Sequence, residues 1–229
     1  MGRIKLYDIV TESIEKDMFE GFDESELKED YPVNFDIFSF KNMRSYAEKV
    51  RYAETHLGKP LGRGSSRLVY RVDENKVLKI AKNKKGIAQN EAEINWADDY
   101  YFEDILAKVF DYDRDNSYWT EMEVAFRATI NDFRRLWGIN FKDLWGYLKM
   151  KHAENNGRRS MFHIEPEVIE QLDNNEHVAQ LIDFMMNSDS PDGDLSKLNS
   201  WGRVHRSEGD TLVLIDFGLT NDVYQSYYA

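Results

Sequence analysis

The sequence of 229 residues contains no cysteine. This absence excludes disulfide bonds, thiolate metal sites and cysteine nucleophiles. The chain has only four prolines and no Pro-rich or Gly/Ser-rich tract, so we expect no linker of those kinds. It also lacks any run apolar enough for a signal peptide or a membrane span. These absences predict a cytoplasmic protein without a membrane partner.

Basic residues are in the minority, because 30 Lys and Arg face 42 Asp and Glu and leave a formal net charge of −12. A surface this acidic repels nucleic-acid backbones and anionic membranes, so no nucleic-acid partner is expected. Three basic clusters are present, and a solvated face is the favoured interpretation of each. They are Lys82, Lys84 and Lys85; Arg134 and Arg135; and Lys149, Lys151, Arg158 and Arg159.

Hydrophobic periodicity then predicts the order of elements. The pattern of 41–58 indicates a helix with a stop at Gly58. Residues 60–82, with "LGRGSSRLVYRV" and "NKVLKIA", indicate three strands joined by turns, and a helix follows from "GIAQNEAEINW". Two strands around "DRDN" come next, then a mainly helical block over 126–188 and a final hairpin ending in "TLVLI".

The stretch "LGRGSSRLVY" contains two glycines and two serines between predicted strands. A Walker A loop opens a helix and a dinucleotide fingerprint joins a strand to a helix, so the position of this loop argues against both. A glycine-rich hairpin that covers phosphates is typical of kinases.

Lys79 interrupts the apolar run "VLKIA", and a lysine in that position needs a partner. The following helix offers Glu91 and Glu93. A 3.6-residue period places Glu91 on the apolar stripe with Ile87 and Ile94. We therefore expect Glu91 to face inward toward Lys79 and Glu93 to face outward.

Candidate magnesium ligands lie near the end of the chain. Asp216 ends the apolar strand "LVLI", and "DGDLSKLN" places Asp194 and Asn199 five residues apart in a loop. Magnesium prefers such hard oxygen donors, with phosphates and water completing its shell. An Asp can also accept the proton of an attacking hydroxyl group.

In this order the motifs resemble those of the protein-kinase-like superfamily, over residues 57–220 or so. The matching positions are Gly62 and Gly64, Lys79, Glu91, the segment "TEME" at 120–123, Asp194 with Asn199, and Asp216-Phe217-Gly218. The resemblance implies an α+β, two-lobed fold, with a five-stranded antiparallel N-lobe sheet plus a helix and a reduced, mainly helical C-lobe. The corresponding domains are an N-terminal extension at 1–56, an N-lobe at 57–123 and a C-lobe at 124–229.

The resemblance also implies a binding site for ATP and Mg²⁺. Lys79, held by Glu91, would contact the phosphates, Asn199 and Asp216 would hold the metal, and Asp194 would be the catalytic base. The remaining nucleotide contacts would come from Gly62, Gly64, Ser65 and Ser66 in the loop, Thr120 behind the adenine, and the backbone of Glu121 and Glu123.

Several positions depart from the family pattern. Arg67 stands where the family has its third loop glycine. Asp192-Gly193 stands in place of the usual His-Arg, and Gly-Asp at this point is closer to the aminoglycoside phosphotransferases. Ser196 stands where the family has a lysine two residues after the catalytic Asp, and Lys197 comes one place later. Only 11 residues follow Gly218, and in this the chain resembles the reduced kinases of some phages. The predicted function is transfer of the γ-phosphate of ATP to a hydroxyl acceptor, with protein Ser/Thr favoured. The alternative is an inactive pseudokinase that binds nucleotide or a protein partner.

Overall fold

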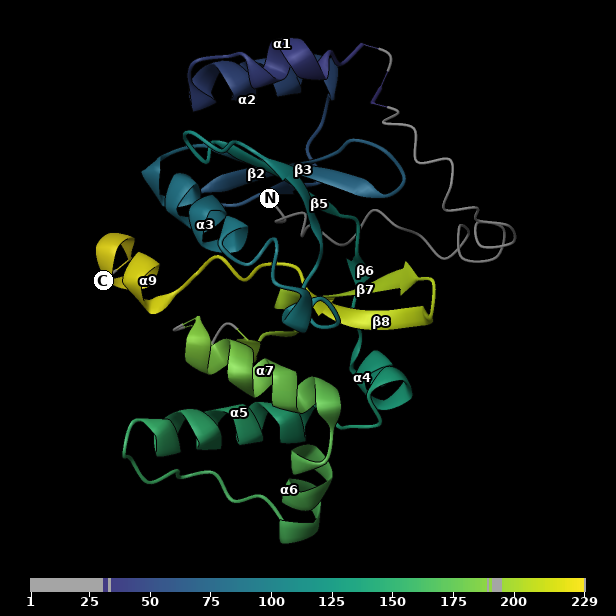
Figure 1. Ribbon diagram of the computed structural model, residues 1–229, viewed down its shortest axis with the longest axis vertical. Helices are drawn as coiled ribbons and strands as arrows, with labels where there is room; N and C mark the ends of the chain where they lie inside the picture. Colours follow the sequence, from purple (N-terminus) through teal and green to yellow (C-terminus); the bar gives the residue numbers. More distant parts are fainter. Residues whose placement is uncertain (1–30, 33, 189, 191–194, 229) are drawn as a thin grey trace, which may run out of the picture. The chain divides into compact units, whose positions relative to one another are not determined.

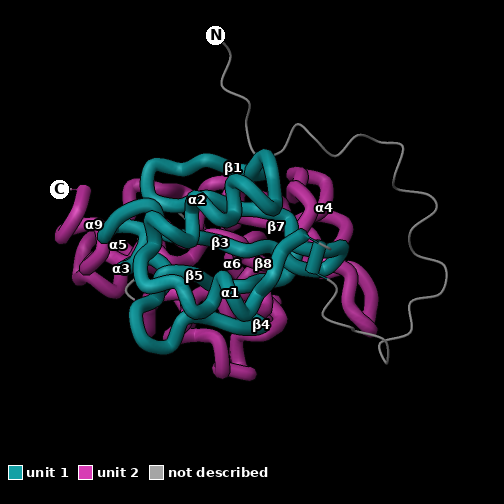
Figure 2. Tube along the Cα trace, turned by 90° about the horizontal axis from the view of Figure 1, so that it is seen from above, with its two compact units in different colours: residues 1–90, 110–124 teal, residues 91–109, 125–229 magenta. Residues whose placement is uncertain are grey.

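The structure, a computed structural model, describes residues 31–32, 34–188, 190 and 195–228. The described part divides into two compact units. Unit 1 contains residues up to 90 together with 110–124, and unit 2 contains 91–109 and 125–229 (Figure 2). The predicted Asp194 lies outside the described residues.

Unit 1 is built on a five-stranded sheet with the order β1-β2-β3-β5-β4 (Figure 1). The β1–β2, β2–β3 and β3–β5 pairs are antiparallel. This topology confirms the prediction of an α+β fold with a five-stranded sheet. The elements of this unit are α1 (Ile37–Lys41), α2 (Tyr46–His56), β1 (Gly62–Arg63), β2 (Arg67–Arg71), β3 (Lys76–Ala81), β4 (Val109–Tyr112), β5 (Trp119–Glu123) and the start of α3 (Lys84–Ile94).

Short-range chemistry explains where these elements begin and end. The Ser45 side chain caps α2 by accepting a hydrogen bond from the Glu48 amide. Gly58 follows that helix with a φ of +74°, a conformation that a residue with a Cβ rarely adopts. In the β2–β3 turn the Asp73 carboxylate accepts hydrogen bonds from the amides of Asn75 and Lys76. The predicted helix stop at Gly58 and the predicted turn between the second and third strands are therefore both confirmed.

The two faces of this sheet have different surroundings. Strand residues of one parity, including Tyr70, Leu78 and Trp119, form a buried cluster with Phe35 and Phe40 from the N-terminal helical segment. Figure 1 shows α1 and α2 on that side of the sheet and α3 on the other. Because side chains alternate along a strand, the residues between these core positions point toward the α3 side.

Unit 2 contains a second, three-stranded sheet of order β6-β7-β8. Its core joins this sheet to the helices, since Trp201 packs edge-to-face against Phe133 and Trp137. Its remaining elements are the end of α3, η2 (Tyr100–Phe102), β6 (Phe126–Arg127), α4 (Ile130–Leu136), α5 (Phe141–Asn155), α6 (Pro166–Asp173), α7 (Glu176–Asn187), η3 (Leu198–Ser200), β7 (Trp201–Arg206), β8 (Gly209–Leu214) and α9 (Asn221–Tyr227).

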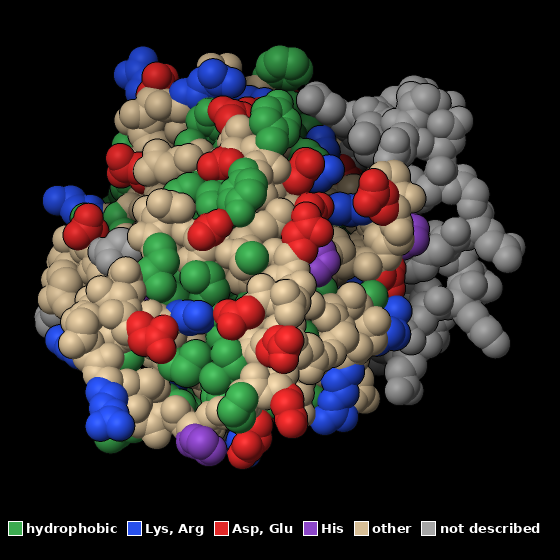
Figure 3. All heavy atoms as spheres, turned by 60° about the horizontal axis from the view of Figure 1, so that its bottom comes forward, with side chains coloured by type: hydrophobic (Ala, Val, Ile, Leu, Met, Phe, Trp, Pro, Cys, Tyr) green, Lys and Arg blue, Asp and Glu red, His purple; other side chains and the backbone are tan. Residues whose placement is uncertain are grey.

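The predictions for the second half of the chain match most of these elements. The helical block and the final hairpin are both present, whereas the sequence did not indicate β6 or α9. Across the described residues, none of the helices combines the length and apolarity that a membrane crossing requires. On the face drawn in Figure 3, acidic and basic side chains are intermixed with hydrophobic ones rather than gathered into a field of one sign.

Candidate functional site

The glycine-rich loop lies in the β1–β2 hairpin, as predicted, where the Gly64 amide donates a hydrogen bond to the Arg67 carbonyl at 3.0 Å. The two serines of the loop differ. Ser65 is exposed at the turn. Ser66 is buried, and its hydroxyl donates a hydrogen bond of 2.5 Å to Oε1 of Gln89 on α3. The Ser66 side chain thus joins the loop to α3. The nucleotide contact predicted for Ser66 could therefore come only from its backbone amide.

Arg67, at the position of the third family glycine, is turned toward α3. Its side chain is buried, and Nη1 donates a hydrogen bond to Oδ1 of Asn90 at 3.3 Å. The guanidinium group is therefore part of the support beneath the loop. Its bulk is accommodated between sheet and helix, away from the turn at Gly64 and Ser65.

Three of the predicted nucleotide-binding residues lie in one row across the sheet. The strand registers pair Gly62 with Val69, Val69 with Lys79, and Lys79 with Thr120. Residues directly opposite one another on paired strands point to the same face. Lys79 and Thr120 therefore share a face with Arg67, on the side of the sheet that packs against α3.

Thr120, at the β5 end of this row, is fully buried. Its hydroxyl oxygen finds no hydrogen-bond partner within the described part of the chain. An unpaired buried hydroxyl group costs free energy, so its presence in a native structure calls for an explanation. The hydroxyl lies opposite Lys79, which is itself only 6% exposed.

The prediction about the two glutamates of α3 was wrong. Glu93 is fully buried at 0% exposure, whereas Glu91 is exposed. Helix α3 buries a polar stripe instead of its isoleucines, with Gly86, Gln89, Asn90 and Glu93 inward. The reason is the hydrogen bonding described above, because Ser66 and Arg67 require polar partners from the helix. The sequence signal was the 3–4 spacing of these polar residues, which the search for an apolar stripe overlooked.

The segment "TEME" at 120–123 lies within strand β5, the second of the two strands predicted around "DRDN". Met122 and Glu123 still pair with Val77 and Lys76 of β3, and the boundary between the units comes after Val124. The Glu121 side chain points to the opposite face from Lys79, where it accepts a hydrogen bond of 2.7 Å from the Tyr31 hydroxyl. The predicted adenine contacts of Glu121 and Glu123 involve backbone groups and stay a prediction.

Burial controls the ionisation of Glu121. It raises the pKa of this carboxyl group, while the hydrogen bond from Tyr31 and the charge of Lys76 oppose the shift. The Lys76 ammonium lies 3.7 Å from Oε2 of Glu121. Strand β3 therefore carries one lysine toward each face of the sheet.

In unit 2, the hairpin β7–β8 brings the two predicted metal ligands to one end. Trp201 pairs with Leu214, and the Ile215 amide donates a hydrogen bond of 2.9 Å to the Ser200 carbonyl. Asn199 and Asp216 adjoin this bonded pair, and both side chains are exposed. Their two oxygen donors suit Mg²⁺. No group of three or more His, Asp or Glu that could hold a metal occurs among the described residues.

The residues around this hairpin end support its geometry. Phe217 is buried and its ring packs edge-to-face against Phe184, which fixes the chain directly after Asp216. The indole of Trp201 donates a hydrogen bond of 2.8 Å to the Leu195 carbonyl and so holds the segment that follows Asp194. Ser196, at the position of the family lysine, is buried, and Lys197 is exposed.

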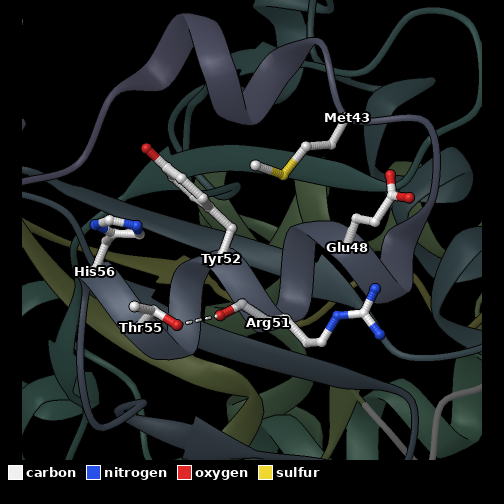
Figure 4. A pocket seen from close by; sticks show the side chains of 6 residues that line it. All are labelled: Met43, Glu48, Arg51, Tyr52, Thr55 and His56. Carbon is white, nitrogen blue, oxygen red and sulfur yellow. Dashed lines mark hydrogen bonds between the residues drawn. The ribbon is translucent and has the colours of Figure 1, made fainter.

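A surface pocket of about 400 Å³ lies elsewhere in unit 1, along one side of α2 (Figure 4). In its lining, the rings of Tyr52 and His56 lie with their centroids 4.1 Å apart and their planes tilted by 34°. Its lining consists of Met43, Glu48, Arg51, Tyr52, Thr55 and His56. None of the predicted site residues belongs to this lining, so the pocket is separate from the row on the sheet.

Comparison with known proteins gives little guidance. No protein-family model matches the sequence, and no curated protein matches it either. Among solved structures, the chain is similar to the ternary complex of streptomycin, ATP and APH(2")-IIa, at 14% identity over 77% of this chain and 72% of that chain. The TM-score is 0.31. A likeness this distant defines neither fold nor function, and the description above rests on the chain's own topology.

Proposed function

We propose that this protein is an ATP-dependent phosphotransferase of the kinase-like type, which moves the γ-phosphate of Mg-ATP to a hydroxyl acceptor. The observation that carries the proposal is the row across unit 1, in which Gly62, Lys79 and Thr120 share one face of the sheet below the glycine loop. A backbone loop, an ammonium group and a buried hydroxyl are the parts that phosphate and adenine recognition needs.

We further propose that Glu93, in place of Glu91, is the carboxylate that pairs with Lys79. Both side chains are buried, and a buried charge is tolerated when an opposite charge compensates it. The stripe of α3 that contains Glu93 also contains Asn90, whose partner Arg67 shares the sheet face of Lys79. The pair would hold the ammonium group where it can contact the α- and β-phosphates.

Asp216 and Asn199 are the proposed ligands of Mg²⁺, with phosphate oxygens and water completing the shell. The metal would neutralise charge that develops on the transferred phosphate. Asp194 is the proposed base that orients the acceptor hydroxyl. We propose a protein Ser or Thr as the acceptor.

The test is nucleotide-induced thermal stabilisation of the full chain, with two lysine variants of the same strand. Lys79→Met should abolish the increase in melting temperature that Mg-ATP produces. Lys76→Met is the matched control, because Lys76 lies three residues earlier on the opposite face, beside Glu121. Each shift is measured against the same variant without nucleotide. Equal shifts in the two variants would remove Lys79 from the site.

Activity needs a separate measurement with γ-labelled ATP and candidate acceptors. Asp194→Ala should abolish label transfer while leaving the ATP-induced stabilisation in place. The alternative, a pseudokinase, is favoured by the buried Ser196 at the position of a family lysine. It predicts ATP-induced stabilisation of the wild type without label transfer to any acceptor.

A further inference from the structure

The carbonyl groups of the glycine loop are bonded to the connection between β3 and α3. Nζ of Lys82 donates a hydrogen bond of 2.9 Å to the Gly64 carbonyl, and Nδ2 of Asn83 donates one of 3.1 Å to the Ser65 carbonyl. The backbone amide of Lys82 donates a third, of 2.8 Å, to the Ser66 carbonyl. Three consecutive peptide groups of the loop are thereby oriented by two neighbouring residues.

This orientation determines where the loop amides point. The C=O and N–H groups of a trans peptide unit point in opposite directions, and no described peptide bond of the chain is cis. Because the Gly64 and Ser65 carbonyls point toward Lys82 and Asn83, the amide N–H groups of Ser65 and Ser66 point away from them. Successive backbone amides that point the same way form a site suited to an anion.

Asn83 also fixes the start of α3. Its Oδ1 accepts a hydrogen bond of 3.2 Å from the Gly86 amide, which is the arrangement of a helix N-cap. The two ends of one side-chain amide therefore bind the helix and the loop at the same time. With the contacts from Ser66 to Gln89 and from Arg67 to Asn90, the loop is attached to α3 at both its turn and its base.

We propose that Lys82 and Asn83 are positioning residues, which hold the loop so that the amides of Ser65 and Ser66 bind the phosphates of the nucleotide. This inference rests on the proposed nucleotide-binding function. Pre-organisation of this kind lowers the entropy lost when a ligand binds. It also explains how the loop is shaped although Arg67 stands at the position of the third glycine.

The test compares ATP with adenosine, because a phosphate loop contributes only to the first. Full-length variants Lys82→Met and Asn83→Ser should each weaken ATP binding about tenfold, which is the loss expected for one hydrogen bond near a charged ligand. Their affinity for adenosine should equal that of the wild type. The serine at position 83 can still cap α3 but lacks the amide donor to Ser65. Lys84→Met is the matched control, because Lys84 is an exposed lysine two residues further along.

The outcomes are distinct. An equal loss for ATP and adenosine would indicate a structural defect and would overturn the positioning role. A loss in Lys82→Met alone would indicate direct attraction between the ammonium and the phosphates, which also overturns it. ATP affinities equal to that of the wild type in both variants would overturn the inference and leave the proposed function standing. Failure of the wild type to bind ATP would overturn the proposed function itself.

Discussion

The contact between Gly86 and the glycine loop gives the sharpest test of how α3 supports that loop. A Cβ atom on Gly86 would lie 2.3 Å from the Ser66 carbonyl oxygen and 3.0 Å from Cα of Ala81. Both neighbours are backbone atoms, so neither can rotate away. To reach an ordinary contact of 3.4 Å, the helix and the loop would have to separate by about 1 Å.

We therefore expect Gly86→Ala to lower the free energy of unfolding by about 2 kcal/mol. Overpacking costs about 1–3 kcal/mol, and the separation also weakens the hydrogen bond from the Lys82 amide to Ser66, worth about 1 kcal/mol. Against these costs, alanine in a helix gains about 1 kcal/mol over glycine. Urea unfolding, followed by circular dichroism and fluorescence, measures the difference.

Gly64→Ala is the control for this prediction. A Cβ at that position would lie 3.5 Å from the Arg67 carbonyl oxygen, which is an ordinary contact, and the φ of Gly64 is outside the left-handed region. Its free energy of unfolding should stay within about 0.5 kcal/mol of the wild type. If Gly86→Ala proved as stable as the wild type, the close packing of α3 on the loop would be refuted.

Three further predictions concern ionisable and polar groups. Tyr70→Phe should raise the free energy of unfolding by about 1 kcal/mol, because the Tyr70 hydroxyl is buried, has no hydrogen-bond partner within the described chain and has a pKa raised by burial to about 12. The pKa of Glu121 in the folded protein is raised above its usual 4.5, so the folded state binds the proton of this carboxyl group more tightly than the unfolded state does. The stability of the wild type relative to Glu121→Gln should therefore fall as pH rises from 4.5 through the pKa of the folded state. Burial acts to raise the pKa of Asp210, but hydrogen bonds with His205 and Arg203 outweigh it and lower that pKa below 3.8. The extra stability of the wild type over Asp210→Asn should therefore be fully present above pH 3.8 and be lost as pH falls through the pKa of the folded state. Chemical unfolding of each pair across pH checks the last two, and curves that run parallel would contradict them.

The strands of the five-stranded sheet and their order along the chain could be predicted from the sequence because local signals define them. The turn at Asp73 and the apolar strand around Lys79 both follow from residue types a few positions apart. The inward face of α3 could not, because its polar residues are buried by partners distant in sequence, as Asn90 is by Arg67. Periodicity shows which residues share a stripe, but the partner decides which stripe is buried.

Strand β5, one of the two strands predicted around "DRDN", includes the segment "TEME", whose Met122 and Glu123 pair with Val77 and Lys76 of β3. Lys82 was predicted only as part of a solvated basic cluster, and no prediction was made for Asn83. An asparagine directly before a helix is a known N-cap signal, so half of the role of Asn83 was available from the sequence. Its contact with Ser65 required the coordinates.

Lys76 and Lys79 of β3 point to opposite faces of the sheet, so the pairing register of this strand determines the composition of both faces. A slip of a single residue would exchange the faces, and it would bring the Lys79 ammonium under Phe40 and Trp119 while moving Leu78 toward α3. A misaligned sheet would thus bury a charge among aromatic rings and place a leucine against the polar stripe of α3. The packing of the hydrophobic layer beneath α1 and α2 therefore fixes the register of β3. A chain that packs this layer correctly also places Lys79 on the α3 side.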